Sequence, residues 1–332
     1  MEMVTGDFNG DGKTDLAINA MANLPFQIYL SNGDGTFSPG AQYPHTGRML
    51  VADVNHDGKA DIVLYSFGSP LQVLLGNGNA TFKSPIAGPS DTFSTDMVSG
   101  DFNADGKLDL VAGTYNGVAF LAGNGDGTFK SPVHSEIAFG GFSGRLVAGD
   151  FSGNGNLGLV GNPPSGTTLS GAIVMAGNGH GTFQPPIVYG VGGVFSNRIV
   201  TADFNSDGIR DFALPGMGGP SGTFVSLYLS VPAPGLSTNK LNFGGHLVGR
   251  TSNALIATLT NVGNAPLLVS SISVTGDYKL TQSCGSKVPI GASCPLDVTF
   301  APIQLGNRIG SITIKDNAAA SPQVISLTGV GK

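Results

Sequence analysis

One acidic loop recurs five times along the chain at a nearly constant spacing. Its first copy, GDFNGDGKTDLAI, begins at Gly6 and places side-chain oxygen atoms at alternate positions around a bend that contains glycine. The first aspartates of successive copies lie 46, 48, 49 and 53 residues apart. Similar segments at such a period predict a repeat architecture in which each repeat is one small supersecondary unit.

Four copies share the same oxygen donors at loop positions 1, 3, 5, 7 and 9. The first, third and fifth residues offer side-chain oxygens, the seventh its backbone carbonyl and the ninth a carboxylate, a set that suits Ca²⁺. The predicted ligands are Asp7, Asn9, Asp11, Lys13 and Asp15; Asp53, Asn55, Asp57, Lys59 and Asp61; Asp101, Asn103, Asp105, Lys107 and Asp109; and Asp203, Asn205, Asp207, Ile209 and Asp211, of which Lys13, Lys59, Lys107 and Ile209 would bind through their carbonyls. We predict about four structural Ca²⁺ ions. The alternative is a set of Asx-rich turns that need no metal.

The fourth copy in chain order is degenerate. It keeps Asp150, but Ser152 and Asn154 are weaker ligands, and Gly158 replaces the carboxylate of the ninth position. We expect this loop to hold an ion weakly or not at all.

The twelfth loop position distinguishes this motif from an EF-hand. An EF-hand has a bidentate Glu there and a helix on each side. The intact copies instead have Ile18, Leu64, Ala112 and Leu214 within short apolar runs, which predict buried strands. We therefore expect a structural clip between strands rather than a switch that opens a helix pair.

A second motif, typified by GNGDGTF, follows each of the first four loops. Its copies begin at Ser31, Gly76, Gly123 and Gly177. Asn-Gly and Asp-Gly between apolar runs favour hairpin turns. The alternative is a weak second ion site at Asp34 or Asp126, although Asn79 and His180 occupy the equivalent position in the other copies.

The apolar runs between the motifs predict four short strands in each repeat. In the first repeat we expect them at residues 2–6, 15–19, 26–30 and 36–43. Four-stranded units at a period of about 48 residues are typical of propeller blades.

The composition supports a turn-rich all-β protein. Gly and Pro account for 52 and 20 of the 332 residues, while 40% of residues are hydrophobic and only 11% are charged, which argues against disorder. The five loops contain 13 of the 22 acidic residues, so four Ca²⁺ ions would change the formal charge from −6 to +2. The chain has no basic patch and no long apolar stretch, so we expect neither nucleic-acid binding nor a membrane span.

The loops GDFNGDGKTDL, ADVNHDGKADI, GDFNADGKLDL and ADFNSDGIRDF resemble the FG-GAP/VCBS repeat family, which includes the propeller of integrin α-subunits and many secreted bacterial proteins. The resemblance covers residues 1–232, with repeats near 1–46, 47–94, 95–143, 144–196 and 197–232. It implies a β-propeller with structural Ca²⁺ on outer loops, a ligand site on a different face, and an extracellular or cell-surface location.

The fifth repeat lacks the second motif, and propellers of this family often have seven blades. We therefore expect about five blades, arranged either as a small ring with one incomplete blade or as part of a larger ring. An N-terminal truncation that removed a leader and one or two blades would explain a partial ring.

Residues 236–332 lack acidic loops and show alternating apolar residues instead. Strands are expected at 254–261, 266–274, 294–300, 310–314 and 323–327, among about seven in an immunoglobulin-like β-sandwich. The stretches LNFGGHLVG and CPLDVTFAP resemble the bacterial ASPM-SPD2-Hydin-like (choice-of-anchor D) family, which implies a spacer or attachment module.

Cys284 and Cys294 are the only cysteines of the chain. A disulfide between them would stabilise the domain and suits an oxidising compartment. Two free core cysteines or half of a metal site are the alternatives, although His246 is the only histidine of the domain, which disfavours zinc.

No catalytic motif accompanies these domains. The sequence contains no metalloprotease, nucleophile-elbow or nucleotide-binding signature, and the five histidines (His45, His56, His134, His180 and His246) are scattered. We expect a non-catalytic extracellular scaffold for adhesion or recognition whose ligand is a protein or a glycan. The alternative is a lectin, an accessory module or a polysaccharide-active enzyme, in which Tyr43, Tyr65, Tyr115 and Tyr189 could replace the absent Trp as sugar platforms.

Overall fold

The computed structural model describes residues 2–19, 24–93, 96–137, 140–164, 171–190, 194–195, 198–217 and 223–332. Every regular element among these residues is a β-strand, which confirms the predicted all-β class. This part of the chain contains no helix that could cross a membrane.

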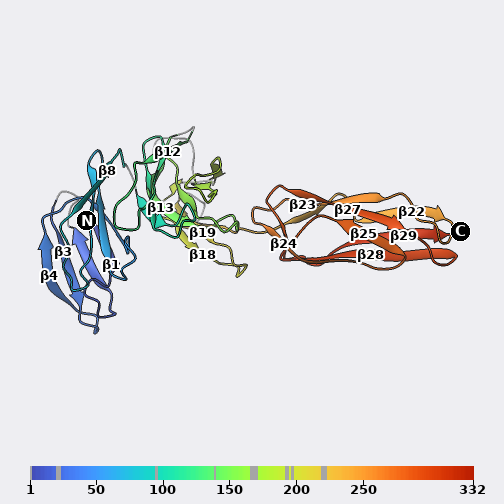
Figure 1. Ribbon diagram of the computed structural model, residues 1–332, viewed down its shortest axis with the longest axis horizontal. Coiled ribbons are helices and arrows are strands. Elements are labelled where there is room, and N and C mark those ends of the chain that lie inside the picture. The colour runs from blue at the N-terminus through green and yellow to red at the C-terminus, as the bar shows by residue number, and fades with distance from the viewer. Residues whose placement is uncertain are drawn as a thin grey trace. The chain divides into compact units, whose positions relative to one another are not determined.

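The first repeat forms a four-stranded antiparallel sheet (Figure 1). Its strands β1 (Glu2–Gly6), β2 (Asp15–Asn19), β3 (Phe26–Ser31) and β4 (Phe37–Tyr43) pair in chain order. Alternate residues of β2 are fully buried, as the two-residue period of a strand requires. The four strands expected in this repeat are confirmed to within one residue at each end.

Three more sheets repeat the same chain-order pairing. The second contains β5 (Arg48–Ala52), β6 (Asp61–Tyr65), β7 (Pro70–Leu74) and β8 (Ile86–Ser90); the third contains β9 (Met97–Gly100), β10 (Asp109–Gly113), β11 (Gly117–Leu121) and β12 (Val133–Glu136); the fourth contains β13 (Ser143–Gly149), β14 (Gly158–Asn162), β15 (Gly171–Met175) and β16 (Ile187–Gly190). The strands after the loops, β6, β10 and β14, are buried along their whole length, which explains why their central residues are apolar.

The fifth sheet is less regular than the others. Strand β19 (Asp211–Met217) pairs with β17 (Val194–Phe195), β18 (Val200–Ala202) and β20 (Thr223–Tyr228). Within the described residues no further strand pairs with β20, which agrees with the missing fifth copy of the second motif.

The core of the repeats lies between neighbouring sheets. Three clusters join consecutive sheets: Phe26, Ile28, Ile62 and Leu64 between the first and second; Leu71, Val73, Leu110 and Ala112 between the second and third; and Val111, Val118, Leu159 and Ile173 between the third and fourth. Burial of a large apolar side chain contributes roughly 1.5–3 kcal/mol. The sheets therefore stabilise one another by packing face to face, as blades do.

The C-terminal strands form a two-sheet sandwich (Figure 1). One sheet has the order β21 (Pro234–Leu236), β23 (Leu255–Asn261), β27 (Ser293–Phe300) and β25 (Tyr278–Gln282); the other has the order β22 (Lys240–His246), β29 (Gln323–Gly331), β28 (Gly306–Asp316), β24 (Leu267–Val274) and β26 (Lys287–Val288). Leu259, Leu296, Phe300 and Ile312 are fully buried between the sheets. The seven longer strands match the number expected for an immunoglobulin-like sandwich.

The chain divides into two compact units. One contains residues 1–150, 156–201 and 212–227, and the other contains residues 151–155, 202–211 and 228–332. Parts of the fourth and fifth acidic loops therefore belong to the unit that contains the sandwich.

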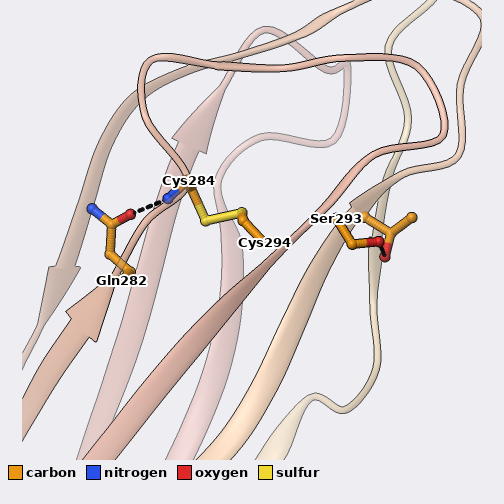
Figure 2. Close-up of a disulfide and its surroundings, with 5 residues drawn as sticks. Gln282, Cys284, Ser293 and Cys294 are labelled. Atoms are coloured by element: carbon orange, nitrogen blue, oxygen red, sulfur yellow. Dashed lines mark hydrogen bonds between the residues drawn. A yellow bond between two sulfur atoms is a disulfide. The ribbon is translucent and has the colours of Figure 1, made fainter.

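The expected disulfide is present in the sandwich (Figure 2). Cys284 and Cys294 are bonded across a Cα–Cα distance of 5.0 Å, and both are buried. The side chain of Gln282 accepts a hydrogen bond from the backbone N–H of Cys284 beside the bridge. Because neither thiol is free, a zinc site at these cysteines is ruled out.

Candidate metal centres

The first-position aspartate organises each intact loop. In the first copy, Asp7 Oδ1 accepts hydrogen bonds from the N–H groups of Gly10 and Asp11, and Oδ2 accepts one from Gly12 over 2.8 Å. The bond to the sixth-position glycine recurs at Asp53, Asp101 and Asp203, with N···O distances of 2.8, 2.9 and 2.9 Å. The aspartate therefore draws the loop backbone around its own carboxylate.

The third- and fifth-position side chains turn into the same loop. Asn9 Oδ1 accepts the N–H of Asp11 over 3.0 Å, and Asp11 Oδ1 accepts the N–H of Lys13 over 2.9 Å. Equivalent bonds occur in the second, third and fifth copies, at Asn55, Asp57, Asn103, Asp105, Asn205 and Asp207. In the four intact loops the structure thus brings together the first three predicted ligands.

Left-handed backbone conformations allow this tight bend. The sixth-position glycine has a φ of +80° at Gly12 and +77° at Gly58, a region that other residues adopt at a cost of roughly 1–2 kcal/mol. The fourth position is also left-handed, even where it is His56, with a φ of 58°. The loop hydrogen bonds offset that strain.

The seventh-position lysine adds a positive charge beside the loop. Lys13 Nζ lies 3.1 Å from Asp11 Oδ2, and Lys59 Nζ lies 3.4 Å from Asp57 Oδ2. The backbone N–H and then the ammonium group of Lys13 hold the pKa of Asp11 below its usual value. The Asp11 carboxylate is therefore kept in its charged form.

The ninth-position aspartate has a second partner far along the chain. Asp15, Asp61, Asp109 and Asp211 are completely buried. One oxygen of each accepts the N–H of the residue at loop position 2, and the other accepts an N–H at or just after the end of the third strand. These donors are Phe8 and Ser31, Val54 and Gly76, Phe102 and Gly123, and Phe204 and Ser230. Burial raises the pKa of Asp61 and Asp109, and the amide hydrogen bonds oppose this effect.

The hydrogen bond that joins the ninth-position aspartate to the third strand was not foreseen from the sequence. The aspartate and the residue that donates this N–H are 14 to 19 residues apart. The only sequence signal is that an aspartate begins an otherwise apolar buried strand, where a carboxylate needs hydrogen-bond donors.

The donor chemistry of the loops fits a hard cation. Among the described residues, no three His, Cys, Asp or Glu side chains converge in a way that could hold a metal. A site therefore requires the Asn oxygen and the seventh-position carbonyl as well as carboxylates, and every atom of that set is an oxygen. Each carboxylate oxygen that accepts one N–H retains further acceptor capacity.

The fourth loop differs from the others in its surroundings. Gly158, in place of the ninth aspartate, begins β14. Lys287 Nζ donates a hydrogen bond of 2.8 Å to the carbonyl of Gly153, within the unit that contains the sandwich. An ammonium group therefore contacts the loop whose predicted donors, Asp150, Ser152 and Asn154, include only one carboxylate.

The second motif forms a turn. Asn32 N–H donates to the carbonyl of Thr36, and Asp34 Oδ1 accepts both the N–H and the hydroxyl of Thr36 at 2.9 and 2.6 Å. The same bonds form at Asn79 and Thr81 and at Asp126 and Thr128. These local partners favour the hairpin interpretation over a second ion site.

The histidines lie apart from one another in the structure. His134 Nε2 lies 3.0 Å from Asp91 Oδ2, and His246 Nε2 lies 2.9 Å from the carbonyl of Phe243. His56 occupies a loop bend, and His180 is exposed within a copy of the second motif.

Two protein-family models match separate parts of the chain. An FG-GAP-like repeat matches residues 7–64, 53–112 and 101–160, and a HYDIN/CFA65/VesB-like Ig-like domain matches residues 234–330. Both resemblances inferred from the sequence are therefore confirmed. Neither family is catalytic, and the combination fits an extracellular scaffold.

Similar solved structures have low sequence identity to the chain. An Agrocybe aegerita lectin, described by its recognition of non-reducing terminal N-acetylglucosamine, is 18% identical over 71% of this chain and 70% of its own, with a TM-score of 0.49. The V. cholerae biofilm matrix protein Bap1 is 13% identical over 99% and 66%, with a TM-score of 0.39. The ASH/PapD-like domain 7 of human CEP192 is 12% identical over 30% and 84%, with a TM-score of 0.25. No curated protein matches the chain.

Proposed function

We propose that this chain, with FG-GAP-like repeats over residues 7–160 and a HYDIN/CFA65/VesB-like Ig-like domain over residues 234–330, is a non-catalytic, calcium-stabilised scaffold for adhesion or recognition outside the cell. The repeats would carry the contact surface, and the sandwich would act as a spacer or attachment module. The observation that supports this proposal best is the common arrangement of oxygen donors in four loops.

In each intact loop, the side chains at positions 1, 3, 5 and 9 and the carbonyl at position 7 would hold the ion. Bound Ca²⁺ would supply positive charge that offsets the repulsion between neighbouring carboxylates. An ion that binds only the folded state stabilises it by mass action. Calcium would therefore be structural, and the ligand of the scaffold would bind elsewhere.

The calcium assignment is tested by stoichiometry. Wild-type protein, freed of loose metal by gel filtration, should contain about four Ca²⁺ ions by elemental analysis, and Asp11→Ala should contain one fewer. Asp150→Ala, in the degenerate loop, is the matched control and should leave the stoichiometry unchanged. A melting temperature that EDTA does not alter, together with no detectable calcium, would refute the proposal.

A second candidate function, glycan binding, is favoured by a small surface hollow. A cavity of about 160 Å³ is lined by Tyr115, Asn116 and His134 among others, and the Tyr115 side chain is 79% exposed. An exposed aromatic ring beside polar groups is a suitable platform for a sugar. Glycan-array binding that Tyr115→Ala abolishes, without turnover of the glycan, would support a lectin over a protein-binding adhesin.

A further inference from the structure

The first strands of four repeats line a cavity of about 840 Å³. The lining comes from β1, β5, β9 and β13 together with Asp96, which directly precedes β9. This volume falls within the roughly 300–1,000 Å³ that is usual for ligand sites. The cavity lies wholly within the unit formed by the repeats and contains none of the loop donors.

Charged residues enter this cavity from one equivalent position of the repeat. The residue five positions before the first loop aspartate is Glu2, Arg48, Asp96, Arg145 and Arg198 in the five repeats. The first four of these line the cavity, whereas Arg198 does not. The repeat therefore builds a set of two carboxylates and two guanidinium groups around one space.

The two carboxylates already accept hydrogen bonds from the protein. Glu2 Oε2 accepts the N–H of Met49 over 3.2 Å. Asp96 accepts the hydroxyl of Tyr65 over 3.2 Å and the N–H of Leu146 over 3.4 Å. These bonds fix both acidic groups beside the cavity, and each retains capacity for donors from a ligand.

The surroundings of the two arginines differ from those of the two carboxylates. Both side chains are exposed, and neither forms an ion pair with any carboxylate in the described part of the chain. A guanidinium group presents five N–H donors in a planar fork that matches a carboxylate. Arg48 and Arg145 are thus available to an anionic ligand.

We propose that this cavity binds a carboxylate-bearing saccharide, of the hexuronate class. Its carboxylate would pair with Arg48 and Arg145, and its hydroxyl groups would donate to Glu2 and Asp96. A fully ionised anion such as sulfate suits the site less well, because it has no hydrogen to donate to Glu2 and Asp96, which would repel it. The proposal rests on the recognition role proposed above and is independent of the calcium assignment.

The test is calorimetric titration of the calcium-saturated full chain with tri-galacturonate and with its methyl ester, which is neutral but otherwise alike. The acid should bind, and the ester should bind at least about tenfold more weakly, since a hydrogen bond to a charged group is stronger than one to a neutral group. Arg48→Gln and Arg145→Gln should each weaken binding of the acid by a similar factor. Arg198→Gln, at the same repeat position outside the cavity lining, should change it less than about twofold.

The proposal would be overturned by no binding of the acid, by equal binding of acid and ester, or by affinities that Arg48→Gln and Arg145→Gln leave unchanged. Binding of a zwitterionic dipeptide instead of the acid would also overturn it, because an ammonium group would then satisfy the two carboxylates. Circular dichroism melting curves show whether each variant is folded, and Arg48→Lys keeps the charge without the fork and should restore binding in part. Calcium content is measured on the same samples, so a failure of the saccharide proposal is distinguishable from a failure of the calcium sites proposed in the acidic loops.

Discussion

The carbonyl of Phe8 accepts a hydrogen bond of 2.7 Å from the N–H of Ala80, although the two residues belong to different repeats. The rings of Phe8 and Phe82 also meet edge to face at 6.0 Å. The same pairing joins Phe102 to Gly181 and Phe183, with an N···O distance of 2.9 Å. The acidic loop of one repeat is thus fastened to the second motif of the next repeat.

This relationship predicts that the residue at loop position 2 has a large effect on stability. Phe8 and Phe102 are each only 2% exposed, so Phe8→Ala or Phe102→Ala should lower the free energy of unfolding of the repeats by about 3–5 kcal/mol. Phe204 occupies the same position in the fifth loop but is 45% exposed, and Phe204→Ala should cost less than about 0.5 kcal/mol. Urea unfolding followed by circular dichroism measures these differences, and similar costs at all three positions would contradict the inter-repeat role.

The local elements were predictable because their signals are local. The strand 15–19 begins at an aspartate and alternates apolar residues, and the structure places β2 at Asp15–Asn19. In the sandwich, the strand expected at 323–327 is longer, extending to Gly331, because β29 pairs with β28 on one side and with β22 in parallel on the other. The turn residues that bound a strand in the sequence do not indicate how many of its residues pair with the neighbouring strands.

The contacts between repeats were not predictable from any single repeat. The bond from Ala80 to Phe8 spans 72 residues, and nothing in the GNGNATF segment identifies its acceptor. The charged position occupied by Glu2, Arg48, Asp96 and Arg145 does leave a sequence signal, since it falls five residues before each loop. The charge of the residue at this position alternates in sign among these four repeats, however, so a search for one repeated residue type does not detect the position.

Asp57 and Asp61 should respond differently to calcium. Asp61→Ala removes the acceptor of two buried N–H groups, at roughly 1–3 kcal/mol each, and should destabilise the protein with or without calcium. Asp57 lies in the exposed bend, where its carboxylate accepts the backbone N–H of Lys59 and pairs with the exposed ammonium group of the same residue, so Asp57→Ala should lower the melting temperature mainly in calcium buffer. Thermal melts of both variants in calcium and in EDTA make the comparison. If Asp57→Ala proved equally harmful in EDTA, its role would be structural rather than metal-binding.

Loss of the disulfide should destabilise the sandwich. The bridge closes a short loop between β25 and β27, so the Cys284→Ser/Cys294→Ser double variant should lose about 2–3 kcal/mol of stability. A reducing agent should shift the wild-type melting temperature in the same direction and leave the double variant unaffected. The same sensitivity in the double variant would show that reduction acts on something other than this bridge.

The Asp277–Arg308 pair should make the stability of the sandwich depend on pH. Arg308 Nε donates to Asp277 Oδ2 over 2.6 Å and Nη2 donates to Oδ1 over 3.1 Å, a bidentate ion pair. The hydrogen bond from Arg308 holds the pKa of Asp277 below its ordinary value. In the unfolded chain that carboxyl titrates near its ordinary pKa of about 3.9. The folded state therefore binds fewer protons, and the pair stabilises the domain above this pKa.

The stabilising effect of the pair should be lost as the pH falls through the lowered pKa of the folded state. The melting temperatures of wild type and Asp277→Asn should thus differ at pH 6 and converge on acidification below about pH 4. Asp297→Asn is a suitable control, because Asp297 forms no ion pair among the described residues of the domain. A wild-type advantage over Asp277→Asn that stays constant down to pH 2 would mean that packing of the side chain, rather than its charge, accounts for the stabilisation.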